Sequence, residues 1–302
     1  MSFTKKLLEV VRQFAICVMS RKEAIIIYSW LSVIGLFIVY RGIPPIILFL
    51  KLFGAVTGTA LSVYFINDIL DLESDIRARE VGSALPSNRP LGAGIVSKSM
   101  MVIFALILAV SGMALSLLID YRVFLLQLAF LVLGIIYSAE PIRLKRRFLL
   151  KRLTVALGGV IACISAGVSA GAITGQLLYL VVIYVVLIFG AGPLVDLRDM
   201  KGDIVTGVKT VPIVWGPEFT VKLALAAFIA MAIAGFVGFY GLGFNIALPI
   251  MGTAVLLAWT YVTYPLLTHW RDNEFVEKAV HKRGLPLYFV LQIIVALGSI
   301  RI

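Results

Sequence analysis

The chain has 302 residues, of which 61% are hydrophobic and 14% are charged, and its formal net charge is +11. Soluble domains carry about 25% charged residues, so this composition excludes an ordinary soluble protein and indicates an integral membrane protein. Binding of nucleic acid is not expected, because the basic residues lie between apolar stretches, where membrane topology and anionic lipid account for them.

Apolar stretches of the length that crosses a bilayer recur along the chain. They predict an all-α, polytopic membrane protein with about nine transmembrane helices in one domain, residues 1–302. The predicted spans are residues 24–40, 45–66, 99–119, 123–137, 153–173, 177–195, 220–241, 244–267 and 284–300. Residues 1–23 carry charges along their length and are predicted to form an amphipathic helix on the membrane surface.

The distribution of basic residues predicts the orientation of the chain. Most of the 27 Lys and Arg fall in segments on the side of the N-terminus, and the positive-inside rule makes that side cytoplasmic. With nine spans, the C-terminus would lie outside the cell membrane. The predicted cytoplasmic connections are the longer ones, and two of them, 67–98 and 196–219, carry acidic motifs. We therefore expect the active site at the cytoplasmic end of the bundle.

The first acidic motif is NDILDLESD, residues 67–75, which directly follows an apolar run. Asn67, Asp71 and Asp75 are spaced i, i+4, i+8, so they would share one face of a helix if the second span continues beyond the membrane. Asp68 lies beside this stripe. The motif therefore predicts a row of oxygen ligands at the edge of the membrane.

The second acidic motif is DLRDMKGD, residues 196–203, at the end of the sixth span. Asp196, Asp199 and Asp203 are spaced i, i+3, i+7 and again share a helical face. Pro193 is expected to kink the helix before this motif. Both motifs follow even-numbered spans, so they are predicted to lie on the same side of the membrane and to meet.

Concentrated carboxylates resist burial unless a cation compensates their charge. Hard oxygen ligands favour Mg²⁺ or Ca²⁺, and Mg²⁺ usually binds one or two carboxylates together with water and substrate phosphate. The two motifs therefore predict two or more Mg²⁺ ions that hold a polyphosphate, although acidic residues at helix ends also serve as caps. The predicted metal ligands are Asn67, Asp68, Asp71, Asp75, Asp196, Asp199 and Asp203.

Basic residues near the motifs suit a diphosphate, because Arg pairs with phosphate oxygens in a bidentate manner and Lys acts as a point charge. The candidates are Arg77, Arg79, Arg89, Arg143 and Lys145. The remaining basic residues of this region are expected to set topology or contact lipid headgroups: Arg146, Arg147, Lys151 and Arg152. Tyr137 could donate to phosphate, lie near a developing cation, or be an ordinary interfacial tyrosine.

These stretches resemble the UbiA superfamily of intramembrane aromatic prenyltransferases. Residues 67–75 resemble its N-D-x-x-D-x-x-x-D motif, and residues 196–203 resemble its D-x-x-D-x-x-x-D motif. The stretches NRPLGAG, YSAEPIRLKR and TGVKTVPIVWG are similar to further segments of that family. Members often carry Arg-Pro at the start of the first span, whereas this chain has Arg21-Lys22, so Arg21 is a weaker candidate for contact with diphosphate.

The resemblance implies Mg²⁺-dependent transfer of an isoprenyl group from an isoprenyl diphosphate, through an allylic carbocation, to an aromatic or lipid acceptor in the bilayer. It implies that diphosphate is held by Asn67, Arg77, Arg79, Arg89, Arg143, Lys145 and Arg21. It implies catalytic roles for Asp71, Asp75, Asp196, Asp199, Asp203, Tyr137 and Lys145. Neither the acceptor nor the length of the prenyl chain follows from the sequence, although quinone-type or other lipid-biosynthetic acceptors are common in the family.

Two other classes of membrane protein are alternatives to this prediction. A cation-coupled transporter is the main alternative, since acidic residues within membranes often mark ion paths, but here the acids lie at the ends of spans. A phosphatidyltransferase acting on CDP-alcohols would need a D-G-x-x-A-R element, and the chain has ESDIRARE instead. His269 and His281 lie away from both motifs and are assigned no catalytic role.

Overall fold

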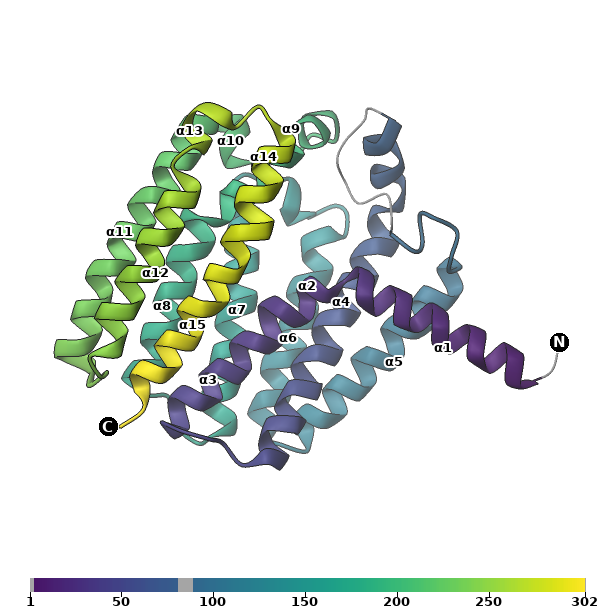
Figure 1. Cartoon of the computed structure of the whole chain (residues 1–302). Helices are drawn as coiled ribbons and strands as arrows, with labels where there is room; N and C mark the ends of the chain where they lie inside the picture. Colours follow the sequence, from purple (N-terminus) through teal and green to yellow (C-terminus); the bar gives the residue numbers. More distant parts are fainter. Residues whose placement is uncertain (1–2, 81–88, 302) are drawn as a thin grey trace.

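The computed structural model describes residues 3–80 and 89–301, and every regular element in that part of the chain is a helix (Figure 1). The N-terminal half contains α1 Phe3–Ser20, α2 Lys22–Ala24, η1 Ile25–Ser29, α3 Trp30–Tyr40, α4 Ile46–Glu80, α5 Lys98–Leu117, α6 Tyr121–Ser138, η2 Leu144–Arg146 and α7 Leu150–Ser169. The C-terminal half contains α8 Gly175–Gly190, η3 Gly192–Val195, α9 Asp196–Val205, α10 Val211–Val214, α11 Pro217–Leu242, α12 Ala247–Thr263, α13 Leu266–His269, α14 Asn273–Glu277, η4 Lys278–Gly284 and α15 Leu285–Ser299.

Among the described residues, eight helical segments are long and apolar enough to cross a membrane, or nine if α1 and α3 are counted together. The chain turns by 62° between Thr4–Ser20 and Ile25–Tyr40, so α1 runs across the bundle while α3 runs along it (Figure 1). Side-chain caps mark the starts of two of these helices. At the start of α5 the hydroxyl of Ser97 accepts from the N–H of Met100, and at the start of α8 the hydroxyl of Thr174 accepts from the N–H of Leu177. The predicted all-helical, multi-pass membrane protein is confirmed.

The two segments predicted as cytoplasmic loops are helical where they carry the motifs. Helix α4 has 35 residues, which is a length of roughly 50 Å at 1.5 Å per residue. It therefore extends well beyond a bilayer core of about 30 Å, and residues 67–75 lie on its extension. Helix α8 ends at Gly190, the 3₁₀ turn η3 carries Pro193, and α9 then begins at Asp196. Each motif thus lies on a helix that continues or restarts at the end of a span.

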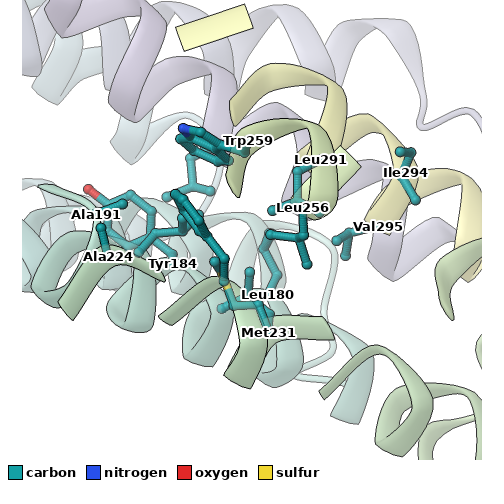
Figure 2. Packing of buried hydrophobic residues seen from close by; sticks show 14 of the residues in the cluster. Leu180, Tyr184, Ala191, Ala224, Met231, Leu256, Trp259, Leu291, Ile294 and Val295 are labelled. Atoms are coloured by element: carbon teal, nitrogen blue, oxygen red, sulfur yellow. The ribbon is translucent and has the colours of Figure 1, made fainter. Parts of the chain in front are cut away.

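Two buried apolar clusters hold the bundle together. One joins α8, α11, α12 and α15, where the rings of Phe228 and Trp259 stack with centroids 4.8 Å apart. Figure 2 shows residues of this cluster, among them Tyr184, Met231 and Trp259. The other cluster joins the N-terminal helices α1 to α7. Tyr28 and Phe130 of this second cluster also line a cavity, so part of the cavity wall rests on close packing.

Helices α4 and α5 approach each other closely at two glycines. A Cβ built on Gly112 would lie 2.8 Å from the backbone nitrogen of Thr59 and 2.9 Å from the carbonyl oxygen of Ala55. A Cβ on Gly58 would lie 2.9 Å from the carbonyl oxygen of Leu108. In addition, Ser62 donates to the carbonyl oxygen of Ala105 across the same interface, at 2.8 Å. This contact sets the position of the helix that carries the first motif.

We expect Gly112→Val to lower the free energy of unfolding by about 1–3 kcal/mol, because the added atoms meet backbone and the two helices must separate. Thermal unfolding in detergent can be followed with a thiol-reactive dye, since Cys17 and Cys163 are both buried. The matched control is Gly252→Val on α12, where an added Cβ meets nothing within 4 Å. Equal melting temperatures for the two variants would contradict the assigned contact.

Candidate active site

The helical extension of α4 and helix α9 lie at the same end of the bundle and pack against each other (Figure 1). Between them, at the ends of α6 and α7, is a charged cavity of about 180 Å³. Five basic and three acidic side chains line it: Arg89, Arg143, Lys145, Arg146, Lys151, Asp71, Asp199 and Asp203. Asn67, Tyr137, Gly202, Thr206 and Val208 complete the described lining. The excess of basic groups suits an anionic ligand.

The first motif contributes Asn67 and Asp71 to this cavity. Asp71 is 3% exposed; its carboxylate contacts the ammonium of Lys145 and lies 3.3 Å from Nη2 of Arg143. Asn67 accepts a hydrogen bond from the hydroxyl of Ser138, which ends α6. The predicted grouping of Asn67 and Asp71 with Arg143 and Lys145 is therefore present. Arg89, from the stretch after the first motif, lines the same cavity.

The turn between α6 and α7 brings its basic residues back onto Asp71. Arg143 has φ of 37°, in the left-handed region that non-glycine residues seldom occupy, and the 3₁₀ turn η2 follows it. Strained backbone of this kind clusters at functional sites. Nη1 of Arg143 lies 2.7 Å from Glu140, and this hydrogen bond lowers the pKa of the Glu140 carboxyl. The strained turn therefore aims Arg143 and Lys145 together at the first motif.

The second motif contributes Asp199 and Asp203, while Asp196 is held differently. Asp196 is 4% exposed; it accepts from Lys151 at 2.9 Å and from Arg152, and it is not among the described residues that line the cavity. Lys151 also lies 3.8 Å from Asp203. Lys151 and Arg152 were expected to set topology or contact lipid, and the structure places them against the second motif instead.

Arg146 differs from that expectation as well, because it lines the charged cavity. Arg147 is exposed and donates to the carbonyl oxygen of Ile142 at 3.1 Å.

One signal in the sequence could have identified the partners of Asp196. Lys151 and Arg152 fall in the first turn of α7, where the helix dipole disfavours a positive charge. Two adjacent cations at that position indicate a nearby carboxylate.

Asp68 and Arg21 pair with each other rather than contributing to the cavity. Asp68 is 2% exposed and receives two hydrogen bonds from the guanidinium of Arg21, with Nε at 2.9 Å, while Nη1 of Arg89 lies 3.5 Å away. The guanidinium of Arg21 also lies 5.5 Å from the centroid of the Tyr64 ring. Neither Asp68 nor Arg21 is among the described cavity residues, so their predicted roles as metal ligand and diphosphate contact have no geometric support.

Three predicted site residues, Asp75, Arg77 and Arg79, lie on helix α4, but their side chains are outside the described part of the structure. Within the described part, no group of three or more His, Cys, Asp or Glu side chains is close enough to hold a metal ion by itself. The Oδ2 atom of Asp203 is buried, accepts no hydrogen bond from the described residues, and lies 3.8 Å from the ammonium of Lys151. This hard carboxylate oxygen shares one cavity with Asp71 and Asp199, an arrangement that fits a divalent cation shared with phosphate oxygens.

An apolar cavity of about 150 Å³ adjoins the charged cavity, and the two share Asn67 and Tyr137. Four aromatic rings line it: Tyr28, Tyr64, Phe130 and Tyr137. Gly134 and Gly158 also form its wall, and a Cβ on Gly158 would lie 2.9 Å from Tyr28 and 3.0 Å from Phe130. The pair of cavities can therefore hold a molecule with an anionic head and an apolar tail, with Tyr137 at the junction.

Known proteins are similar to this chain in sequence. Residues 28–280 match the UbiA prenyltransferase family. The chain belongs to this family. It is 28% identical over 209 residues to the digeranylgeranylglyceryl phosphate synthase of Thermococcus sibiricus, covering 69% of this chain and 71% of that protein. It is 24% identical over 226 residues to the bacteriochlorophyll synthase 34 kDa chain of Chloroflexus aurantiacus, covering 74% and 72%.

Solved structures of UbiA proteins share the fold. A structure of digeranylgeranylglyceryl phosphate synthase superposes with a TM-score of 0.71 and 20% identity, over 97% of this chain and 100% of that one. A UbiA homologue from Archaeoglobus fulgidus, bound to DMAPP and Mg²⁺, superposes with a TM-score of 0.67 and 17% identity, over 95% and 99%. The predicted family, the helical membrane fold and the enzyme class, a UbiA-type prenyltransferase, are confirmed.

Proposed function

We propose that this UbiA protein transfers an isoprenyl group from an isoprenyl diphosphate to an aromatic or lipid acceptor, with Mg²⁺ as cofactor. The observation that carries the proposal is the junction of the charged and apolar cavities at Asn67 and Tyr137. The charged side matches a diphosphate and the apolar side matches an isoprenyl chain. The high density of basic residues around this end supports a cytoplasmic site, with a cytoplasmic N-terminus and an external C-terminus.

In this proposal the basic residues bind the diphosphate group of the donor, both before and while it leaves the allylic carbon. Lys145, Arg143, Arg89 and Lys151 surround the cavity and offset the negative charge that grows as the allylic C–O bond breaks and its electrons move to the diphosphate. Mg²⁺ held by Asp71, Asp199 and Asp203 would add to this charge stabilisation. The nucleophilic carbon or oxygen of the acceptor then bonds to the allylic carbon and loses its proton.

The apolar cavity protects the cation that forms. Its ring-lined wall excludes water that would otherwise capture the carbocation, and the aromatic faces favour a positive charge. Tyr137 lines both cavities, so it lies where the allylic carbon meets the diphosphate. We therefore assign Tyr137 a role in the reaction, through its aromatic ring, in preference to the role of an ordinary interfacial tyrosine.

The proposal is tested by incubating purified protein with geranylgeranyl diphosphate and a panel of acceptors, with detection of prenylated product by mass spectrometry. Because one relative is a digeranylgeranylglyceryl phosphate synthase, the first acceptor to include is a polar-headed lipid such as geranylgeranylglyceryl phosphate. Aromatic acids follow. We expect a product with Mg²⁺ and none with EDTA. Product formation that is unchanged by EDTA would contradict the proposed role of the metal.

The tail site is tested at Gly158. We expect Gly158→Val to raise KM for geranylgeranyl diphosphate by about 10-fold, because the added methyl groups enter the space between Tyr28 and Phe130 and remove apolar contact area. The effect should be smaller for the shorter dimethylallyl diphosphate. Gly241→Val on α11, where an added Cβ meets nothing within 4 Å, is the control. An equal change in KM for both donors would place the tail elsewhere.

A further inference from the structure

A chain of charged contacts joins the second motif to the last connection before α15. Helix α9 packs against α14, which lies beside it at the same end of the bundle (Figure 1). Nε of Arg198 lies 3.0 Å from Oδ1 of Asp199, and Nη1 of the same side chain lies 2.6 Å from Oε2 of Glu277. Nδ1 of His281 lies 3.1 Å from the same Oε2 atom. Glu277 therefore lies behind Arg198, on the side away from Asp199.

The position of Arg198 matters because it shares a carboxylate with the charged cavity. Asp199 lines that cavity, and its side chain is 19% exposed. Both oxygens of Asp199 accept from Arg198, Oδ1 from Nε at 3.0 Å and Oδ2 from Nη2 at 3.4 Å, so an uncompensated guanidinium at this position would compete with a divalent cation for them. Glu277 offers Arg198 a second carboxylate, and the shorter of the two contacts is the one to Glu277. The guanidinium is thereby held between the two acids.

We propose that Glu277 is a positioning residue for the metal site, which acts by holding the guanidinium of Arg198 and offsetting its charge, so that Asp199 keeps its orientation and can bind the cation in competition with Arg198. This inference rests on the proposed function, because it takes Asp199 as a metal ligand. Glu277 lies 79 residues after Arg198 in the sequence, and no spacing pattern links the two. Residues that support metal ligands in this way change metal affinity by about 10- to 100-fold when they are replaced.

The experiment measures binding of Mn²⁺, as a probe for Mg²⁺, by electron paramagnetic resonance in the presence of geranyl thiolodiphosphate. We expect Glu277→Gln to weaken Mn²⁺ binding by at least about 10-fold. The matched control is Glu274→Gln on the same helix, since the Glu274 carboxylate pairs with Lys278 and its side chain is 77% exposed. That variant should bind Mn²⁺ as the unmodified protein does.

A second substitution separates positioning from a loss of folding. If Arg198 is the competitor that Glu277 restrains, adding Arg198→Gln to Glu277→Gln should restore part of the lost Mn²⁺ affinity, which damage to the fold would not do. Glu277→Asp keeps the charge but shortens the reach to Arg198, so it should bind Mn²⁺ with intermediate affinity. It also provides the test if Glu277→Gln does not fold.

The outcomes distinguish this inference from the proposed function. Unmodified protein that binds no Mn²⁺ with the analogue would overturn the proposed function and the inference together. Tight binding by the unmodified protein and equally tight binding by Glu277→Gln would overturn only the role of Glu277. A double variant that is weaker than Glu277→Gln would show that Arg198 is not the competitor, and would also overturn the inference.

Discussion

Asp71→Asn is expected to lower kcat/KM for prenyl transfer by at least about 100-fold, because it removes a negative charge from the centre of the charged cavity. Asp71 is 3% exposed and contacts both Lys145 and Arg143. Asparagine has nearly the same shape, so packing is retained while a carboxylate that we assign to the metal is lost. The measurement is a steady-state assay of the prenylated product over a range of Mg²⁺ concentrations.

The control for this substitution lies two residues away in the same motif. Glu73 is exposed on α4 and is not among the described residues that line the cavity, so Glu73→Gln should retain full activity. A similar loss in both variants would mean that the total charge of the motif matters, and not the position of Asp71. Full activity of Asp71→Asn would remove Asp71 from the proposed metal site.

Arg21→Met is expected to destabilise the protein by about 3 kcal/mol, with a clear fall in Tm, because it removes the hydrogen-bonding partner of a buried carboxylate. Asp68 is 2% exposed, and its contact to Arg89 is longer, at 3.5 Å. Arg21 connects the end of α1 to the first motif helix, so its loss should also loosen α1. Thermal unfolding with a thiol-reactive dye measures the change, since Cys17 lies in α1 and is buried.

The double variant Arg21→Met with Asp68→Asn separates the structural role from the predicted contact with diphosphate. Neutralising Asp68 removes the uncompensated charge, so a large part of the lost stability should return. A substrate contact would behave differently: Arg21→Met would raise KM for the donor with no change in Tm, and Asp68→Asn would not repair it. That second pattern would restore Arg21 to the diphosphate site.

The sequence was sufficient to predict the fold because each span carries its own signal. Apolar length identified the spans, and the spacing of Asn67 and Asp71 on one side, and of Asp199 and Asp203 on the other, predicted helical faces that the structure brings into one cavity. The helical continuation of α4 through the first motif follows from this spacing as well. These features depend on local periodicity, which a single sequence displays.

The pairing of charges could not be predicted in the same way, because it depends on helices that are distant in sequence. Asp68 and Asp196 belong to the motifs by spacing, yet each forms salt bridges with basic side chains from elsewhere in the chain. Asp68 pairs with Arg21, which follows α1, and Asp196 pairs with Lys151 and Arg152 at the start of α7. A motif fixes which face of its own helix a residue occupies. Which neighbour faces it is decided by the packing of the bundle.

In the proposed function, one cavity joins both motifs around a diphosphate and a divalent cation. The most direct test is binding of geranyl thiolodiphosphate to purified protein, with Mg²⁺ or with EDTA, for the unmodified chain and for Asp71→Asn and Asp203→Asn separately. We expect Mg²⁺-dependent binding that either substitution, one in each motif, weakens strongly. Binding that is indifferent to Mg²⁺ and to both substitutions would contradict it.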